Sequence, residues 1–239
     1  MRNRIGVLLS VAVLSTVLLA TLYVAKFGNP FFGHEGIPGI DISHHQRPRD
    51  WESVKQAGTR FVYIKATEGA DWTDGGYREH EESARDHGLI VGAYHFFTFC
   101  ADGKTQAAHF LKRIDLRPGD LPPAVDVEAG GNCTDNPDPD AMRKSLGEFM
   151  GAMDQATGSE PILYTTQGFY WKYFPEGFGE SRFWIRNLFW CPDDSDRFPL
   201  CQYGVSRIEG TAPDRVDRNG FMGGEKAFQR FLYHPVVAH

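Results

Sequence analysis

The feature that most constrains the fold of this chain is the regular alternation of short apolar segments with amphipathic ones. The apolar segments have the length of strands and are expected at residues 39–43, 60–67, 89–97, 123–128 and 161–165. Helical periodicity lies between them, at about residues 50–57, 77–87, 103–114 and 140–156. This alternation of strands with helices predicts βαβ units and therefore a parallel sheet.

The pattern changes after residue 175. Strand-like segments continue at residues 183–188, 199–204 and 215–221, with loops between them, and a final helix is expected at about residues 224–232. Eight strands within roughly 200 residues predict an α/β fold, a TIM-like barrel whose last third is irregular. Such a barrel carries its chemistry at the carboxyl ends of its strands.

The amino-terminal segment is expected to stand outside this domain. Residues 5–25 carry no charge, follow two arginines, and would form a helix about 31 Å long, close to the roughly 30 Å of a bilayer core. An uncleaved signal anchor or transmembrane helix is expected in residues 1–26, and a cleaved signal peptide is the alternative. Residues 27–36 are expected to be a linker, and residues 37–239 the barrel. The positive flank places that barrel outside the cytoplasm, tethered to a membrane or secreted.

Four cysteines agree with an exported protein. Pairing Cys191 with Cys201 and Cys100 with Cys133 is the simplest of three possible connectivities, and four buried thiols are the alternative. Acidic residues outnumber basic ones, 31 to 25, and no basic stripe appears, so nucleic acid is not an expected partner. A monomer without a cofactor is expected.

Several expected strands end in acidic side chains. Asp126 and Glu128 alternate along one strand and so point to the same side. Two carboxyl groups in one cleft cannot ionise independently, so one pKa rises, which supplies the general acid that glycosidic cleavage needs. Asp41 and Asp217 add acids from other strands. The alternative for Asp126 and Glu128 is a role as solvated strand-end or helix-capping residues.

Histidines offer a weaker hypothesis. Asp41, His44 and His45 could ligate a metal, but the chain lacks His-x-x-x-His and zinc-spaced cysteines, so no metal site is expected. His95 is expected to be a packed strand residue. The nucleophile-elbow, phosphate-loop and dinucleotide motifs are also missing from the sequence.

Taken together, five motifs resemble the glycoside hydrolase family 25 lysozymes of the Chalaropsis type. They follow the family's order across residues 39–221 and are Gly-Ile-Asp-Ile-Ser at 39–43, Tyr-Ile-Lys-Ala-Thr-Glu-Gly at 63–69, Gly-Leu-Ile-Val-Gly-Ala-Tyr-His-Phe at 88–96, Asp-Val-Glu at 126–128 and Val-Asp-Arg-Asn at 216–219. The resemblance implies a distorted (β/α)5(β)3 barrel. It also implies hydrolysis of the β-1,4 bond between N-acetylmuramic acid and N-acetylglucosamine in peptidoglycan glycan strands.

The resemblance further implies roles for single residues. Glu128 matches the general acid. Asp126 matches the second acid, which orients the substrate's N-acetyl group or acts directly as nucleophile or electrostatic stabiliser. Asp41 and Asp217 match the flanking acids of the catalytic set. The expected sugar-binding residues are Lys65, Tyr94, Phe96, Tyr164, Trp184 and Gln202.

The chain departs from the family pattern at two places. Cys201-Gln202-Tyr203 stands where Trp-Gln-Tyr is usual, and Arg186 stands where the family usually has alanine. Both changes touch the expected sugar groove. Two other functions remain open: a barrel that binds glycan without cutting it, and a chitinase-like hexosaminidase. The chitinase motif would need acids where Leu121 and Ala124 stand.

Overall fold

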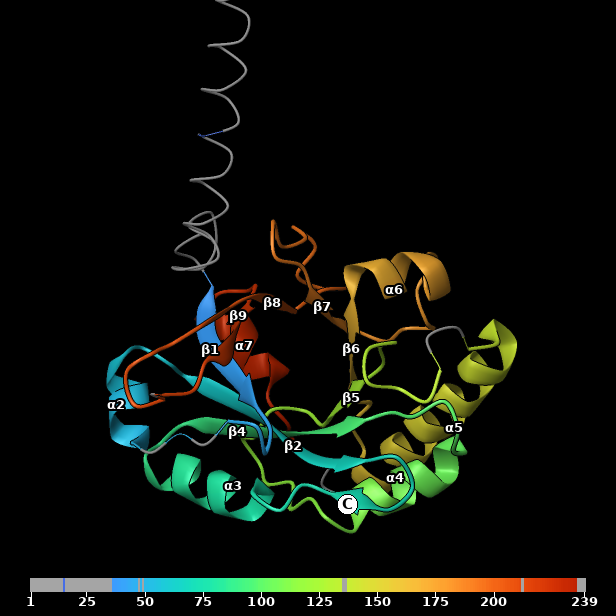
Figure 1. Ribbon diagram of the computed structural model, residues 1–239, viewed down its shortest axis with the longest axis horizontal. Helices are drawn as coiled ribbons and strands as arrows, with labels where there is room; N and C mark the ends of the chain where they lie inside the picture. Colours follow the sequence, from blue (N-terminus) through green and yellow to red (C-terminus); the bar gives the residue numbers. More distant parts are fainter. Residues whose placement is uncertain are drawn as a thin grey trace, which may run out of the picture.

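Eight strands close into a barrel. The computed structural model describes Ser15 and residues 36–46, 48, 50–134, 137–211 and 213–235. The barrel strands are β1 (Ile37–Ile42), β2 (Phe61–Glu68), β4 (Ile90–Phe96), β5 (Ala124–Asp126), β6 (Ile162–Thr166), β7 (Phe183–Arg186), β8 (Leu200–Ser206) and β9 (Val216–Phe221). Their order is β1-β9-β8-β7-β6-β5-β4-β2, and pairing of β1 with β2 closes the ring (Figure 1).

Strand direction divides the barrel into two parts. All neighbours from β1 through β2 and β4 to β8 are parallel, whereas β9 runs antiparallel to both β8 and β1. The first five barrel strands are each followed by a helix, and the last three have none between them. The closed eight-strand α/β barrel expected from the sequence is therefore confirmed.

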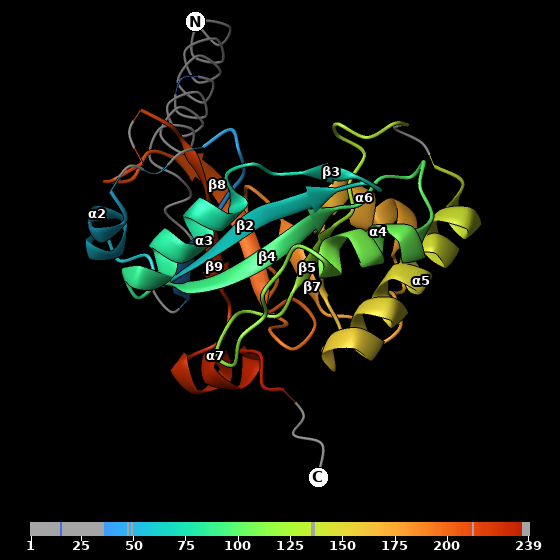
Figure 2. The same ribbon diagram turned by 90° about the horizontal axis from the view of Figure 1, so that it is seen from below.

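The helices are α2 (Trp51–Gln56), α3 (Tyr77–Asp86), α4 (Gly103–Leu111), α5 (Pro139–Thr157), α6 (Gln167–Tyr173) and α7 (Glu225–Phe231). Helices α2 to α6 lie outside one part of the ring of strands, and α7 lies at one end of the barrel (Figures 1 and 2). Side chains cap several amino termini: Asp50, Asp102 and Asp138 each accept a hydrogen bond from the backbone three residues ahead. Left-handed Gly158, with φ of 69°, ends α5.

Two apolar clusters hold the barrel together. One lies between the strands and the surrounding helices and includes Val62, Phe110 and Phe149. The other fills the barrel interior, where Phe61 and Tyr63 occupy the space that a side chain at Gly39 or Gly92 would need. A Cβ on Gly39 would lie 2.2 Å from the Phe61 ring, so glycine is required there.

Helix α7 lies at the amino-terminal end of the parallel strands (Figure 2). Its Phe228 ring lies 5.8 Å from that of Phe61 and 5.1 Å from that of Phe221. The polar side chains described below lie at the opposite end of the barrel, where the parallel strands end.

Some sequence-based boundaries were wrong. Strand β5 ends at Asp126, so Glu128 lies beyond it, and β7 ends at Arg186 instead of residue 188. Helix α6 was not expected; it begins directly after β6, with Thr166 as its cap. The two-residue strand β3 (Trp72–Thr73), which pairs with the end of β2, was also not expected.

The cysteines form two disulfides, Cys100–Cys133 and Cys191–Cys201, which is the pairing favoured by the sequence. The expected membrane or signal helix in residues 5–25 lies, apart from Ser15, outside the described residues. Among the residues that are described, none of the helices combines the length and apolar character needed to cross a bilayer.

Candidate active site

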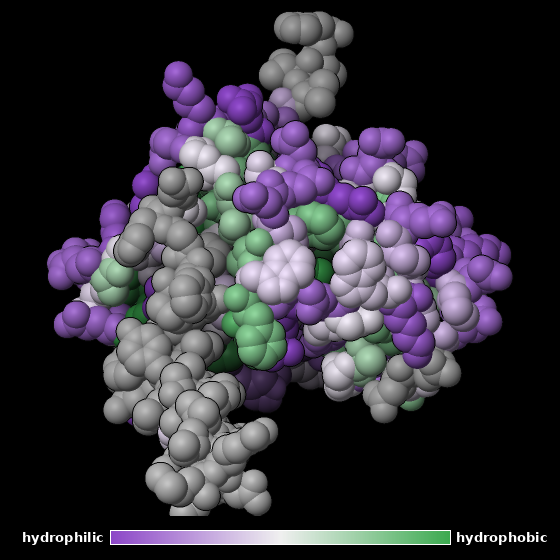
Figure 3. All heavy atoms as spheres, turned by 90° about the horizontal axis from the view of Figure 1, so that it is seen from above, coloured by the Kyte–Doolittle hydropathy of each residue, from purple (hydrophilic) through white to green (hydrophobic). Residues whose placement is uncertain are grey.

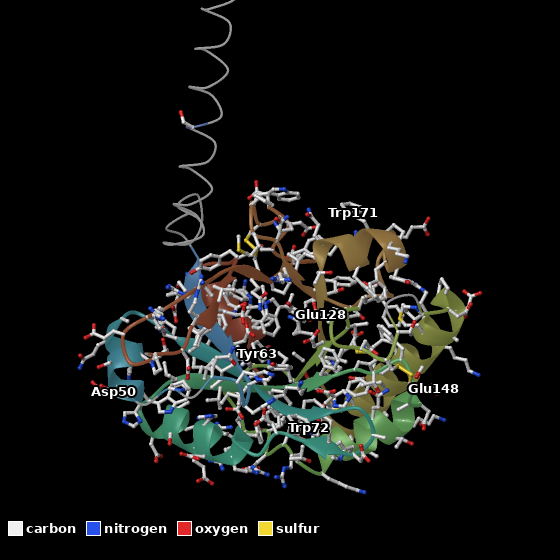
Figure 4. All side chains as sticks on the ribbon, viewed as in Figure 1. Asp50, Tyr63, Trp72, Glu128, Glu148 and Trp171 are labelled. Atoms are coloured by element: carbon white, nitrogen blue, oxygen red, sulfur yellow. A yellow bond between two sulfur atoms is a disulfide. The ribbon has the colours of Figure 1, made fainter. Side chains whose placement is uncertain are left out.

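A pocket of about 270 Å³ opens at the carboxyl ends of the parallel strands. Its lining comes from seven of the eight barrel strands and the residues that follow them: Asp41, Tyr94, Asp126, Glu128, Tyr164, Trp184, Arg186, Gln202 and Asp217. The labelled side chain of Glu128 lies near the middle of the ring, with Trp72 and Trp171 on opposite sides of it (Figure 4). The barrel therefore brings together all four acids singled out in the sequence.

Asp217 reaches this pocket because β9 is antiparallel. It is the second residue of β9 and therefore lies near the start of that strand. An antiparallel strand begins where its parallel neighbours end, and the register places Asp217 directly opposite Asp41. Directly paired residues on one face have Cβ atoms roughly 5 Å apart. The two carboxyl groups are thus held close together.

The pKa of Asp41 is raised to about 8. Burial is the largest cause, because only 8% of the residue is exposed, and the negative charge of Asp217 adds to it. Hydrogen bonds from Asn219 and Gln202 act in the opposite direction. Burial also raises the pKa of Asp217, which the positive charge of Arg186 lowers in part.

Two side-chain amides grip the same oxygen of Asp41. Asn219 Nδ2 donates to Asp41 Oδ2 at 2.7 Å, and Gln202 Nε2 donates to it at 2.9 Å. The indole N–H of Trp184 donates to Asn219 Oδ1 at 2.8 Å, and the Tyr164 hydroxyl donates to Gln202 Oε1 at 3.1 Å. Because an indole can only donate, it fixes which end of Asn219 faces Asp41.

This network changes the expected role of two aromatic residues. Trp184 and Tyr164 line the pocket, but only 2% and 6% of them are exposed. The Trp184 ring stacks on Tyr63, with centroids 4.7 Å apart, and contacts Tyr164 edge-on at 4.8 Å. They form the floor of the pocket and orient its amides. Tyr94 also lines the pocket and is less deeply buried.

Asp126 and Glu128 form the other acidic side of the pocket. Burial raises both pKa values, and for Asp126 the charge of Glu128 is the second cause. Asp126 Oδ1 is buried and has no hydrogen-bond partner among the residues the structure describes, so a charge on this carboxylate is poorly stabilised. The acids titrate as a coupled set, with a proton held near neutral pH.

Lys65 and Phe96, both expected to bind sugar, are not among the residues lining the pocket. Lys65 Nζ instead forms an ion pair with Glu68 at 2.7 Å and lies 4.7 Å from the centre of the Phe96 ring. Lys65 still acts on the pocket at longer range, because its charge lowers the pKa of Asp126 and of Glu128.

His95 is a packed strand residue, as expected. Gln106 Nε2 donates to two backbone carbonyls, so its Oε1 accepts from His95 Nε2 at 3.1 Å, while His95 Nδ1 accepts from the Thr67 hydroxyl at 2.7 Å. Burial lowers its pKa to about 3, which keeps it neutral. His44 turns to Asp74, whose Oδ2 lies 3.3 Å from His44 Nδ1, and not to Asp41.

Sequence reasoning placed Arg186 at the expected sugar groove without giving it a role, and it did not single out Asn219. Arg186 lines the pocket, and Asn219 holds Asp41 beneath it. Strand periodicity could have found both, since Arg186 is two residues after Trp184 and Asn219 is two after Asp217 on the same strand faces.

Comparison with known proteins identifies relatives along most of the chain. The family described as "Glycosyl hydrolases family 25" matches residues 40–201. The uncharacterized protein YegX of Escherichia coli K12 is 32% identical over 207 residues, covering 82% of this chain and 73% of YegX. Lysozyme M1 of Streptomyces globisporus is 32% identical, covering 79% of this chain and 68% of that protein.

Solved structures agree with the sequence matches. A family 25 glycosyl hydrolase from Bacillus anthracis superimposes with a TM-score of 0.78 at 30% identity, covering 86% of this chain and 97% of that one. A bacterial lysozyme from Streptomyces coelicolor gives 0.75 at 29% identity, covering 84% and 98%. With its barrel, its motifs and its relatives in agreement, this chain belongs to glycosyl hydrolase family 25.

Proposed function

We propose that this protein is a muramidase, which hydrolyses the β-1,4 bond between N-acetylmuramic acid and N-acetylglucosamine in peptidoglycan. Relatives named lysozyme and N,O-diacetylmuramidase support this activity. The observation that carries the proposal is the pocket in which four carboxyl groups, all with raised pKa values, face one another. Glycoside hydrolysis needs a protonated and an ionised carboxyl group in one site.

Glu128 is the proposed general acid. It lies beyond the end of β5, lines the pocket and remains partly open to solvent, so a bound glycan can reach its carboxyl group. Burial raises its pKa and keeps it protonated to a higher pH than an exposed glutamate, while Arg186 limits that rise. Protonation of the glycosidic oxygen by Glu128 lets the leaving sugar depart as a neutral alcohol.

Asp126 is proposed to act on the sugar whose anomeric carbon is attacked. When it is ionised, its carboxylate orients and polarises the N-acetyl group that attacks this carbon. The alternative is that Asp126 attacks or stabilises the carbon directly. In either role its negative charge is needed at the moment when positive charge develops on the sugar ring.

Asp41 and Asp217 are proposed to set the electrostatics of the catalytic pair. The charge of each raises the pKa of another acid in the pocket: Asp217 acts on Glu128, and Asp41 acts on Asp126. Gln202 and Asn219 hold Asp41 in place. The four acids therefore share fewer than four negative charges at neutral pH, and a bell-shaped pH–rate profile in the mildly acidic range is expected.

The protein is proposed to work outside the cytoplasm, with residues 5–25 as membrane anchor and residues 37–239 as the catalytic domain. The uncharged segment behind two arginines supports this arrangement. Fractionation of a tagged full-length chain tests it. Recovery of the tag in membranes, with the carboxyl terminus open to external protease, supports an anchor, and a cytoplasmic product refutes it.

The activity is tested by digesting purified peptidoglycan with the purified protein and reducing the new ends with borohydride. A muramidase leaves muramic acid at the new reducing end, so muramitol is the expected product. Glucosaminitol would refute the assigned bond, and binding without any new reducing end would point to a glycan-binding barrel.

The matched control changes one carboxyl group at a time. Glu128→Gln removes the transferable proton with little change of shape, whereas Glu176→Gln makes the same change at an exposed position. Only the first is expected to lose muramitol release.

A further inference from the structure

The pocket contains one cationic side chain. Arg186 ends β7, where the register pairs it with Thr166 on β6 and with Gln202 on β8. It faces the same side of β7 as Trp184 and lines the pocket, and all other charged residues of the lining are acids. A guanidinium at this position is therefore in reach of whatever sugar the pocket holds.

No side chain in the described part of the protein forms an ion pair with Arg186. Neither Glu128 nor Asp217 forms an ion pair with it, and Arg186 makes no side-chain hydrogen bond to a described residue. By contrast, Lys65 Nζ forms an ion pair with Glu68 at 2.7 Å. The donors of Arg186 are thus left for a ligand.

The electrostatics of two neighbouring acids agree with the position of Arg186 in the pocket lining. Its positive charge lowers the pKa of both Glu128 and Asp217. An arginine fork binds a carboxylate through two parallel hydrogen bonds, and this charged pair is about twice as strong as bonds between neutral groups. A neutral sugar hydroxyl would make much poorer use of such a group.

Muramic acid carries one group that matches this chemistry. Its lactyl substituent ends in a carboxylate when it is free, and in a neutral amide when a stem peptide is attached. The substituent is on the same sugar as the anomeric carbon that a muramidase attacks, so it enters the same pocket or its edge.

We propose that Arg186 is a specificity-determining residue that binds the lactyl carboxylate of peptide-free muramic acid. This inference rests on the muramidase function proposed above. It makes glycan strands without stem peptides the preferred substrate. The reaction that supplies them is hydrolysis of the amide between the lactyl carbonyl and the first amino acid of the stem, which releases the peptide and leaves the carboxylate.

The competing role for Arg186 is to balance the charge of the catalytic acids. In that role its removal slows cleavage of every substrate by the same factor and moves the alkaline limb of the pH profile upward. If Arg186 instead recognises the carboxylate, its removal slows cleavage of substrates with a free lactyl carboxylate more than cleavage of substrates in which that group is an amide. The two roles are separated by changing the enzyme and the substrate together.

The test uses two glycan oligomers of equal length, one with free lactyl carboxylates and one with the same groups converted to carboxamides. The native protein is expected to have a kcat/KM about 10- to 100-fold higher for the carboxylate form, the range of a charged hydrogen-bonded pair. Arg186→Gln should abolish this preference mainly through KM, and Arg186→Lys should keep part of it. Arg117→Gln, at an exposed loop before β5, should behave as native protein.

Equal losses on both oligomers with Arg186→Gln would overturn the proposal, as would a native protein without preference. Calorimetry measures the binding of both oligomers to the Glu128→Gln variant. This measurement distinguishes failure of the Arg186 proposal from failure of the proposed muramidase function. Tighter binding of the carboxylate form that depends on Arg186 supports the inference even when no bond is cut. Equal binding overturns it even when the native protein is an active muramidase.

Discussion

Asp41 and Asp217 stand directly opposite each other where β1 pairs with the antiparallel strand β9. Like charges in direct cross-strand positions destabilise a sheet, so this pairing is costly for folding. Burial of Asp41 and the charge of Asp217 raise the pKa of Asp41 to about 8, while hydrogen bonds from two amides to its Oδ2 limit that rise. A second pair of acids, Asp126 and Glu128, shares the same pocket.

The stability of the protein is expected to fall as the pH rises from about 4 to 8. In that window folded Asp41 keeps a proton that the unfolded chain, with a pKa near 3.8, has released. The folded state then binds more protons, so raising the pH favours unfolding, by at most about 1.4 kcal/mol per pH unit for one group. Thermal melting at pH 5 and pH 8 measures the change.

Asp41→Asn is expected to reduce this pH dependence and to raise the melting temperature at pH 8. Some dependence remains, because the pKa values of Asp126, Glu128 and Asp217 are raised too. The exposed Asp86→Asn serves as control and should melt as the native protein does. An unchanged difference between pH 5 and pH 8 in the Asp41 variant would contradict the assignment of the raised pKa.

Glu128→Gln is expected to lower kcat by about 10²- to 10⁴-fold, the usual contribution of general acid catalysis. The loss is expected in kcat, with KM little changed, because the proton is transferred only in the transition state. Release of soluble muropeptides measures it. A native rate in the folded variant would remove Glu128 from the mechanism.

Asn219→Leu is expected to cost about 1–3 kcal/mol of stability, since it leaves the buried Trp184 N–H without an acceptor. It should also raise the pKa of Asp41, which the hydrogen bond from Asn219 lowers. A double-mutant cycle with Trp184→Phe tests the contact by urea unfolding. The two effects should be non-additive, and simple addition would show that the contact contributes nothing.

Removal of the Cys100–Cys133 disulfide is expected to destabilise the protein more than removal of Cys191–Cys201. The first bridge spans 33 residues and the second 10, so loop closure predicts about 4 and about 3 kcal/mol. Paired alanine substitutions and urea unfolding give the comparison. The reverse order would mean that packing around buried Cys201 matters more than loop closure.

The surface near β7 also carries exposed apolar side chains. Leu188, Phe189 and Trp190 follow β7, and Trp171 lies on α6. In the view from above, apolar and weakly polar residues gather toward the middle of the face, and hydrophilic residues lie around them (Figure 3). The Cys191–Cys201 disulfide fastens the end of this segment to β8, next to Gln202.

Local sequence determined most of the barrel. Apolar strands in alternation with amphipathic helices predicted the parallel part, because the period of side-chain burial differs between strands and helices. It also predicted that Asp126 and Glu128 share one side, and both line the pocket, although β5 ends at Asp126 and Glu128 lies beyond the strand. Helix α6 escaped notice because no loop separates it from β6, so the two periods run into one another.

Tertiary structure alone decided how the site is assembled. Asp217 meets Asp41 only because β9 runs antiparallel, and strand direction depends on ring closure by residues far apart in the chain. The orientation of Asn219 depends on Trp184, 35 residues away in sequence. Lys65 and Arg186 are both positively charged. Lys65 forms an ion pair with Glu68, whereas Arg186 faces the pocket and forms no ion pair with a described residue. Periodicity sets which face a side chain takes, whereas long-range packing sets its neighbours, and those neighbours determine its pKa.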